Sequence, residues 1–218
     1  MTVIAVALDS RGNEAAAPWI DAADPSYLCL IDRTHRLAEL YDIINVPSAV
    51  WINEAGRIVR PPESAGMSDG VVKAMIDVIQ GGREGGSGKL TEESKTALRT
   101  ARQGYCDAVR DWVQKGDDSQ YALSEEQVLA RMRLPTDQHA EATAYFHLGY
   151  YLHTQGRVPQ AKWALERAVE KRPESISILR QFGDLEVPGS MGGERFFKLM
   201  RSRGSRPLYE PSDIPTTS

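Results

Sequence analysis

Residues 41–59 indicate the fold of the first part of this chain. They read Tyr-Asp-Ile-Ile-Asn-Val-Pro-Ser-Ala-Val-Trp-Ile-Asn-Glu-Ala-Gly-Arg-Ile-Val. The apolar run Ala49–Ile52 is rich in β-branched and aromatic residues and predicts a strand covered on both faces. Four turn-forming residues follow, and 57–59 then predicts a second strand that returns antiparallel to the first. Pro47 has no N–H to give to a sheet, so it must stand at the entrance of the first strand. We predict that the Val46–Pro47 peptide bond is cis, which leaves the neighbouring backbone available for binding.

The segments on either side of this stretch alternate between strand and helix patterns. Val3–Leu8 and Tyr27–Ile31 are short apolar runs and predict strands. Pro18 is acceptable in the first turn of a helix, so we predict that a helix begins there and runs to Ala23. Asp32 or Thr34 is expected to cap a second helix that reaches Tyr41. A broad apolar stripe predicts a further helix over 68–80.

This order of elements resembles the thioredoxin fold, and most closely its TlpA/ResA-like and peroxiredoxin-like branch, over residues 2–80. In that fold a cis-proline opens the strand that faces the redox site, and a β-hairpin and a helix follow. The resemblance implies that Val46 and Pro47 hold extended peptide or thiol substrates through the backbone. The alternative is an ordinary βαβ fragment in which the Val-Pro step is a turn.

The chain lacks the redox motif that the resemblance calls for. A thioredoxin-fold oxidoreductase needs a low-pKa thiolate at the N-terminus of its first helix. In the family that helix and its strand precede the equivalent of Val3–Leu8, where this chain has two residues. Cys29 and Cys106 form no Cys-x-x-Cys pair, and we expect both to be buried as small hydrophobic residues. No catalytic residue is therefore assigned, and we expect no turnover from this chain.

The thioredoxin-like sheet is accordingly expected to be incomplete. In the family the missing strand lies between the equivalents of Val3–Leu8 and Ala49–Ile52, so its loss leaves two strand edges unpaired. These strands would close up on each other, accept a strand from a second copy, or keep open edges prone to self-association. A start codon assigned too late is the simplest cause, and translation of the DNA upstream of Met1 tests it.

A glycine-rich segment over 81–88 predicts a flexible linker, and every periodic segment after it is helical. The tetratricopeptide repeat (TPR) pattern is matched closely by Tyr145, Leu148, Gly149, Leu152, Gly156, Ala161, Leu165, Ala168 and Pro173. A shift by the 34-residue period of that repeat places Phe182-Gly183 where Leu148-Gly149 stood, so 176–202 resembles a degenerate second helix pair. We expect residues 90–218 to fold without the first half.

One face of the first repeat helix carries Phe146, Tyr150 and His153. In TPR domains this face lines the concave groove, so the resemblance implies that these residues bind protein partners. For Phe146 and Tyr150 the alternative is packing against the neighbouring helix.

Composition excludes several classes of partner. The net charge is −4 and no long basic run occurs, so we expect no nucleic acid and no anionic membrane as partner. No apolar run approaches the ~18 residues of a membrane span. No cluster has metal-ligand spacing and no phosphate-binding glycine loop occurs, so we expect no metal and no cofactor. Two isolated cysteines fit a reducing compartment, and a cytoplasmic location is expected unless the true N-terminus lies upstream.

Together these patterns predict an α/β plus all-α protein, with an incomplete thioredoxin-like sheet followed by a TPR-like helical repeat. The predicted domains are 1–80, a linker over 81–90, helices over 91–203 and an irregular tail over 204–218. The predicted function is that of a thioredoxin-fold thiol redox protein coupled to a TPR protein-interaction module. The alternative is a non-catalytic adaptor that binds protein partners through the TPR groove.

Overall fold

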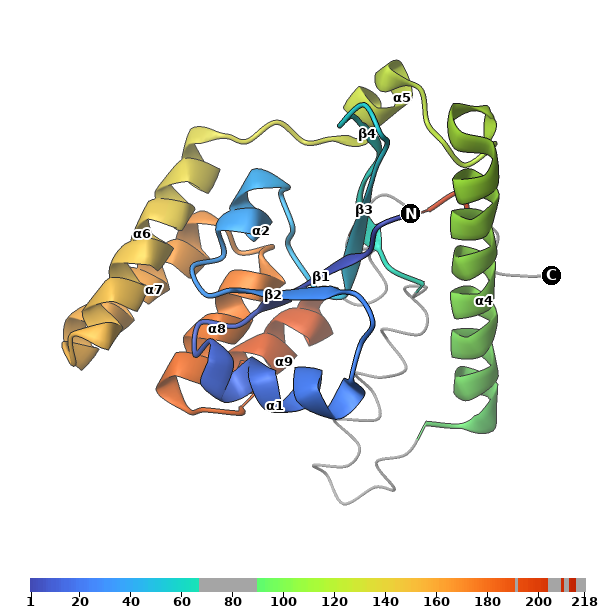
Figure 1. The fold of residues 1–218 in the computed structure, drawn as a ribbon. Helices are drawn as coiled ribbons and strands as arrows, with labels where there is room; N and C mark the ends of the chain where they lie inside the picture. The colour runs from blue at the N-terminus through green and yellow to red at the C-terminus, as the bar shows by residue number, and fades with distance from the viewer. Residues whose placement is uncertain (67–89, 191, 204–208, 210–211, 215–218) are drawn as a thin grey trace. The chain divides into compact units, whose positions relative to one another are not determined.

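The computed structural model describes residues 1–66, 90–190, 192–203, 209 and 212–214. In these residues the protein is mixed α/β, with eight α-helices, one short 3-10 helix and two two-stranded sheets (Figure 1). The predicted helix over 68–80 and the glycine-rich segment over 81–88 lie outside the described residues.

The chain divides into two compact units. The first unit comprises Met1–Asn45 and Leu134–Phe196, and the second comprises Val46–Arg133 and Phe197–Ser218. Each unit thus draws on residues from both sides of the glycine-rich segment, whereas the predicted domains follow one another along the chain. The physical reason is that each N-terminal sheet contacts helices from the later part of the chain: the turn after the first sheet's first strand through polar groups, and the second sheet through buried side chains.

The sheet of the first unit is parallel. Strand β1 (Ile4–Leu8) pairs with β2 (Leu28–Asp32) from Ile4↔Leu28 to Leu8↔Asp32, and helix α1 (Asn13–Ala23) connects them. Both strands lie within one residue of their predicted bounds. The predicted start of α1 is wrong, because the helix begins five residues before Pro18, which lies inside it.

Asp32 fixes the start of the short helix α2 (Arg36–Leu40). One of its carboxylate oxygens accepts from the Arg36 N–H at 3.0 Å, and the other accepts from the Leu37 N–H at 2.7 Å. The predicted capping role of Asp32 is confirmed, and the helix ends one residue before its predicted end at Tyr41.

In the first unit the helices begin and end close to where the repeat pattern predicts. They are α6 (Asp137–Thr154), α7 (Val158–Lys171), α8 (Ile176–Glu186) and the first residues of α9 (Gly193–Arg203). Gly156, at φ +70°, turns the chain between α6 and α7, which pack side by side (Figure 1). A left-handed conformation of this kind costs glycine little, because it has no Cβ.

Two glycines 34 residues apart, one in α6 and one in α8, lie where an added Cβ would clash with a neighbour. A Cβ at Gly149 would lie 2.6 Å from Leu165 Cγ, and a Cβ at Gly183 would lie 2.4 Å from the Gly192 backbone. Both positions therefore require glycine for the same physical reason. The helix pair and the 34-residue spacing are observed, and their assignment to the TPR family remains a prediction.

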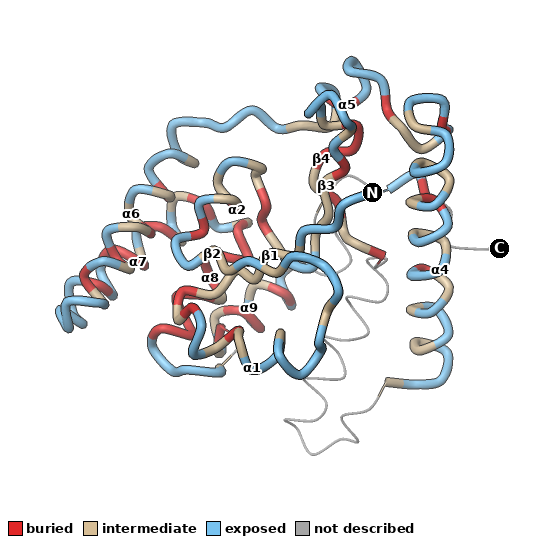
Figure 2. Tube along the Cα trace, viewed as in Figure 1, coloured by how far each residue is buried: buried red, intermediate tan, exposed pale blue. Residues whose placement is uncertain are grey.

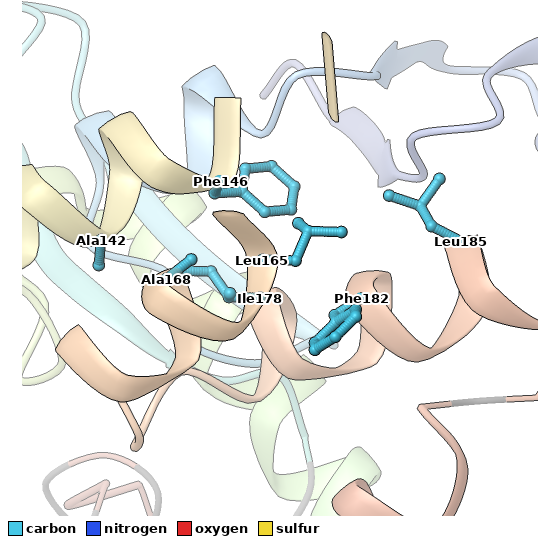
Figure 3. Close-up of a cluster of buried hydrophobic side chains, with 7 residues drawn as sticks. All are labelled: Ala142, Phe146, Leu165, Ala168, Ile178, Phe182 and Leu185. Carbon is cyan, nitrogen blue, oxygen red and sulfur yellow. The ribbon is translucent and has the colours of Figure 1, made fainter. Parts of the chain in front are cut away.

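The core of the first unit consists of side chains from α6, α7 and α8 (Figure 3). Its buried members are Ala142, Phe146, Leu165, Ala168, Ile178, Phe182 and Leu185. Helix α8 is buried along most of its length, and α6 and α7 keep one exposed side each (Figure 2).

The second unit is built around a hairpin. Strand β3 (Ser48–Ile52) pairs antiparallel with β4 (Ile58–Ser64), as the sequence predicts. The helices of this unit are α4 (Glu92–Lys115), the 3-10 turn η1 (Gly116–Asp118) and α5 (Glu125–Arg131). Both longer helices begin at side-chain caps, since the Thr91 side chain accepts from the Ser94 N–H and Ser124 forms a capping box with Gln127.

Trp51 joins the hairpin to α4. Its ring stacks on Trp112 at a centroid distance of 5.1 Å, and its indole N–H donates to the Tyr105 hydroxyl at 2.8 Å. Trp51 and Val59 are buried with Ala108 of α4 in one cluster. Packing therefore links residues that lie before and after the glycine-rich segment.

Candidate functional site

The residues predicted to bind a protein partner do not share one exposed surface. Phe146 is 2% exposed and lies in the core of the first unit, so its packing alternative is the one observed (Figure 3). Tyr150 is half-buried against the same cluster. His153 is half-buried near the end of α6.

The turn between β2 and α2 covers the part of α6 that carries Phe146. The His35 ring lies against Phe146 at a centroid distance of 5.0 Å. The next residue on α6, His147, places its Nε2 atom 2.9 Å from the Thr34 carbonyl oxygen. A carbonyl oxygen can only accept, so Nε2 carries the proton in this contact. The chain's own β2–α2 turn thus occupies the face predicted to receive a partner.

His35 is held in an unusual state. It is 6% exposed, its φ is +58°, and neither ring nitrogen has a hydrogen-bond partner among the described residues. Burial lowers the pKa of His35 to about 4, helped by the nearby His147 and opposed by the carboxylate of Asp32. His35 is therefore neutral at physiological pH. Left-handed backbone in a residue other than glycine and unpaired buried nitrogens are both energetically unfavourable, and such features concentrate at functional sites.

Polar contacts hold the turn that follows β1 to α8. The Ser10 N–H donates to Gln181 Oε1 at 3.0 Å, and Arg11 Nε lies 2.9 Å from Asp184 Oδ2. In open parallel sheets ligands bind beyond the carboxyl ends of the strands. Here helix α8 of the same chain meets that edge, so the arrangement fastens the sheet to the helix.

The second predicted site, at Val46 and Pro47, lies in the second unit. The Val46–Pro47 bond is cis, as predicted, and both residues are exposed. The Pro47 carbonyl accepts from the Ala65 N–H at 3.3 Å. Among the residues that the structure describes, Val46 makes no backbone hydrogen bond, and β3 pairs with β4 alone. The entrance of β3 therefore offers backbone groups to an extended chain.

A buried charge network on β4 was missed by the sequence analysis. Arg60 is 0% exposed, and its guanidinium donates to both carboxylate oxygens of Glu63, at 2.8 and 2.9 Å, and to the Tyr121 carbonyl. It also lies over the Trp51 ring, 5.3 Å from the centroid. Burial opposes the charge of Arg60, but its bonds to Glu63 and Asp213 outweigh burial and raise its pKa. The signal available was an arginine and a glutamate three residues apart, directly after the predicted strand over 57–59.

The two cysteines do not form a redox pair. Cys29 is half-buried on β2 in the first unit and Cys106 is exposed on α4 in the second, and both are free thiols. The expected burial of Cys106 is wrong. In the described part of the chain no group of three or more His, Cys, Asp or Glu side chains is arranged to hold a metal ion.

Comparison with protein-family models, with curated proteins and with solved structures finds no significant match. None of the described helices combines the length and the apolar character that a bilayer-spanning segment needs.

Proposed function

We propose that this chain is the peptide-holding part of a thioredoxin-type thiol redox protein, coupled to a TPR-like helical module, and that it has no turnover of its own. The observation that carries the proposal is the exposed entrance of β3 at Val46–Pro47, where the Val46 backbone makes no hydrogen bond within the described residues. An extended peptide binds such a strand by main-chain hydrogen bonds, as an added strand.

The arrangement of the hairpin supports binding in this mode. The buried Trp51 and its bond to Tyr105 anchor β3 to α4 through side chains, so its backbone edge is not needed to hold the hairpin in place. An edge that is fixed by side chains can accept a ligand strand without rearrangement.

The test is a titration of the full chain with a labelled extended peptide of mixed polar and apolar sequence, followed by fluorescence anisotropy. A matched peptide with alternate amide nitrogens methylated cannot donate along one edge. We expect saturable binding of the first peptide and at least ~10-fold weaker binding of the second, because a few main-chain bonds each contribute about 1 kcal/mol. Equal binding of the two peptides would contradict strand addition.

Reduction of an insulin-type disulfide substrate tests the absence of turnover. We expect no activity above the buffer blank, because Cys29 and Cys106 form no Cys-x-x-Cys pair that could resolve a mixed disulfide. Turnover that disappears on the substitution Cys106→Ser would contradict this expectation.

A non-catalytic adaptor is the second candidate, and an exposed apolar surface on α6 and α7 favours it. Tyr145, Leu148 and Tyr151 follow one another at three-residue spacing on α6, and Trp163 of α7 meets Tyr145 edge-on at 5.7 Å. Leu148 is 41%, Tyr151 58% and Trp163 49% exposed. If peptide binding is insensitive to amide methylation and is lost in a Tyr151→Ser/Trp163→Ser variant, the adaptor function is the better one.

A further inference from the structure

The buried Arg60 of the second unit meets a short piece of the chain's own C-terminal tail. Arg60 Nη2 donates to Asp213 Oδ1 at 2.6 Å and reaches Ser212 Oγ at 3.4 Å. Arg131, at the end of α5, donates from Nη2 to the other oxygen of Asp213 at 3.0 Å. The Asp213 carboxylate is therefore held between two guanidinium groups.

The residue that follows supplies an apolar anchor. Ile214 is 5% exposed and is buried in one cluster with Trp51, Val59 and Ala108. The Ile214 N–H donates to Ser212 Oγ at 3.3 Å. Residues 212–214 form neither helix nor strand, so their side chains make the attachment. Peptide ligands are held in the same way, by a carboxylate that pairs with arginines and by an aliphatic side chain that is buried beside it.

Contacts outside the tail also hold Arg60. Its guanidinium donates two hydrogen bonds to Glu63 and one to the Tyr121 carbonyl. When Asp213 is bound, two arginines face two carboxylates. When it is removed, Arg60 keeps Glu63 as its partner and Arg131, whose side chain is 28% exposed, loses its carboxylate. The two guanidinium groups then face one carboxylate, so the site favours a second one.

Asp213 is accessible although its partner is buried. Its side chain is 47% exposed, whereas that of Arg60 is 0% exposed. Burial acts to raise the pKa of Asp213, but the hydrogen bonds from Arg131 and Arg60 outweigh it and lower the pKa to about 2. The carboxylate is thus ionised throughout the physiological range.

We propose that Arg60, Arg131 and the Trp51–Val59–Ala108 cluster form a binding site for a partner peptide in which an acidic residue precedes a branched aliphatic one. The tail segment Ser212–Asp213–Ile214 occupies this site in cis and competes with the partner. This site is distinct from the strand entrance at Val46–Pro47, and its test does not depend on strand addition.

The experiment uses the full chain and a fluorescein-labelled peptide with the sequence of residues 209–218. In the wild-type chain the tail competes at an effective concentration in the millimolar range, so apparent binding is weak. In the variant Asp213→Asn/Ile214→Ala the competitor is weakened, and we expect the peptide to bind at least ~10-fold more tightly. The same peptide carrying the Asp213→Asn change should lose at least ~10-fold in affinity.

Two arginine substitutions, one at the proposed site and one beside it as a control, test where the peptide binds. Arg131→Gln in the tail-weakened chain should reduce peptide affinity about 2- to 5-fold, since it removes one partly exposed charge partner. Arg133→Gln changes an exposed arginine two residues away and should leave the affinity unchanged.

Equal affinities of the wild-type and tail-weakened chains, or equal binding of the Asp and Asn peptides, would overturn the proposal. If circular dichroism shows that the tail-weakened chain does not fold, the wild-type chain is titrated to millimolar peptide. Saturable binding of the Asp peptide alone then supports the site, and its absence overturns it. A wild-type dimer that becomes monomeric on Asp213→Asn would also overturn it, because the occupant would be a second copy.

Discussion

The two compact units solve the same problem by different means. Both must fix a small two-stranded sheet against helices that come much later in the sequence. The first unit uses an apolar helical core with close glycine contacts, and its sheet is attached at the edges by polar groups such as Ser10 and Arg11. The second unit places a buried arginine network beside its aromatic cluster. Apolar packing tolerates loss of polar contacts, whereas a buried network fails when one member is removed.

The largest effect is expected at Arg60 of the second unit. Arg60→Met leaves Glu63 buried without its partner, which should destabilise the second unit by about 3–5 kcal/mol. Urea unfolding followed by Trp fluorescence measures it. The double variant Arg60→Met/Glu63→Leu removes both charges and should recover part of the loss. No recovery would mean that the charge pair is not the cause.

The first unit should instead respond to acid through His35. The pKa of His35 is about 4 in the folded chain and 6.5 in the unfolded chain, so the unfolded state binds the proton first as pH falls. The contribution of neutral, buried His35 to the free energy of unfolding is therefore fully present above pH 6.5. About 3 kcal/mol of stability is lost as the pH falls from 6.5 to 4.

Denaturant midpoints measured from pH 7.5 to 4 test this for wild type and His35→Asn. Asparagine is neutral and tolerates the left-handed backbone. The denaturant midpoint of the variant should therefore depend much less on pH between 6.5 and 4 than that of the wild type. His153→Asn is the control and should keep it. A wild-type-like slope in His35→Asn would rule out His35 as the titrating group.

Close helix packing in the first unit should be tested at Gly149. A Cβ there would meet Leu165 at 2.6 Å and the Ala161 carbonyl oxygen at 3.2 Å, so Gly149→Ala should cost about 2 kcal/mol through overpacking. Gly156 has open space around it, and Gly156→Asn should change stability by about 0.5 kcal/mol or less, because asparagine adopts φ > 0. A smaller loss at Gly149 than at Gly156 would contradict the packing argument.

The smallest expected effect concerns the start of α5 in the second unit. The Ser124 side chain accepts from the Gln127 N–H, and Gln127 returns a bond to the Ser124 N–H. Ser124→Ala should therefore reduce stability by about 1 kcal/mol. The neighbouring exposed Glu126→Ala is the control, and equal losses in the two variants would argue against the capping box.

Local features were predictable because their causes are local. These features are the strands of both sheets, the hairpin turn and the caps at Thr91 and Ser124, all of which depend on residues close in sequence. The 34-residue spacing of Gly149 and Gly183 is itself a feature of the sequence. The predicted start of α1 is wrong because it relied on the preference of proline for the first turn of a helix, whereas the helix begins at Asn13, directly after Gly12 at φ +68°.

The composition of the two units and the sites could not be predicted, because they depend on contacts between distant residues. Nothing near Phe146 in sequence shows that His35 packs on its ring, and nothing near Arg60 shows that Asp213 reaches it. Phe146 has the same helical spacing whether it faces a groove or a core. Phe146 faces a core because the β2–α2 turn, more than 100 residues earlier in the chain, packs on it.

The most direct test of the account is equilibrium unfolding of the fragment 90–218 beside the full chain. If the units combine residues from both sides of the glycine-rich segment, the fragment lacks Trp51 and Val59, and α4 loses its core partners. We expect a fragment with reduced helical content, a broadened transition and a midpoint well below that of the full chain. A fragment that unfolds cooperatively at the midpoint of the full chain would contradict the account and would favour two domains in sequence order.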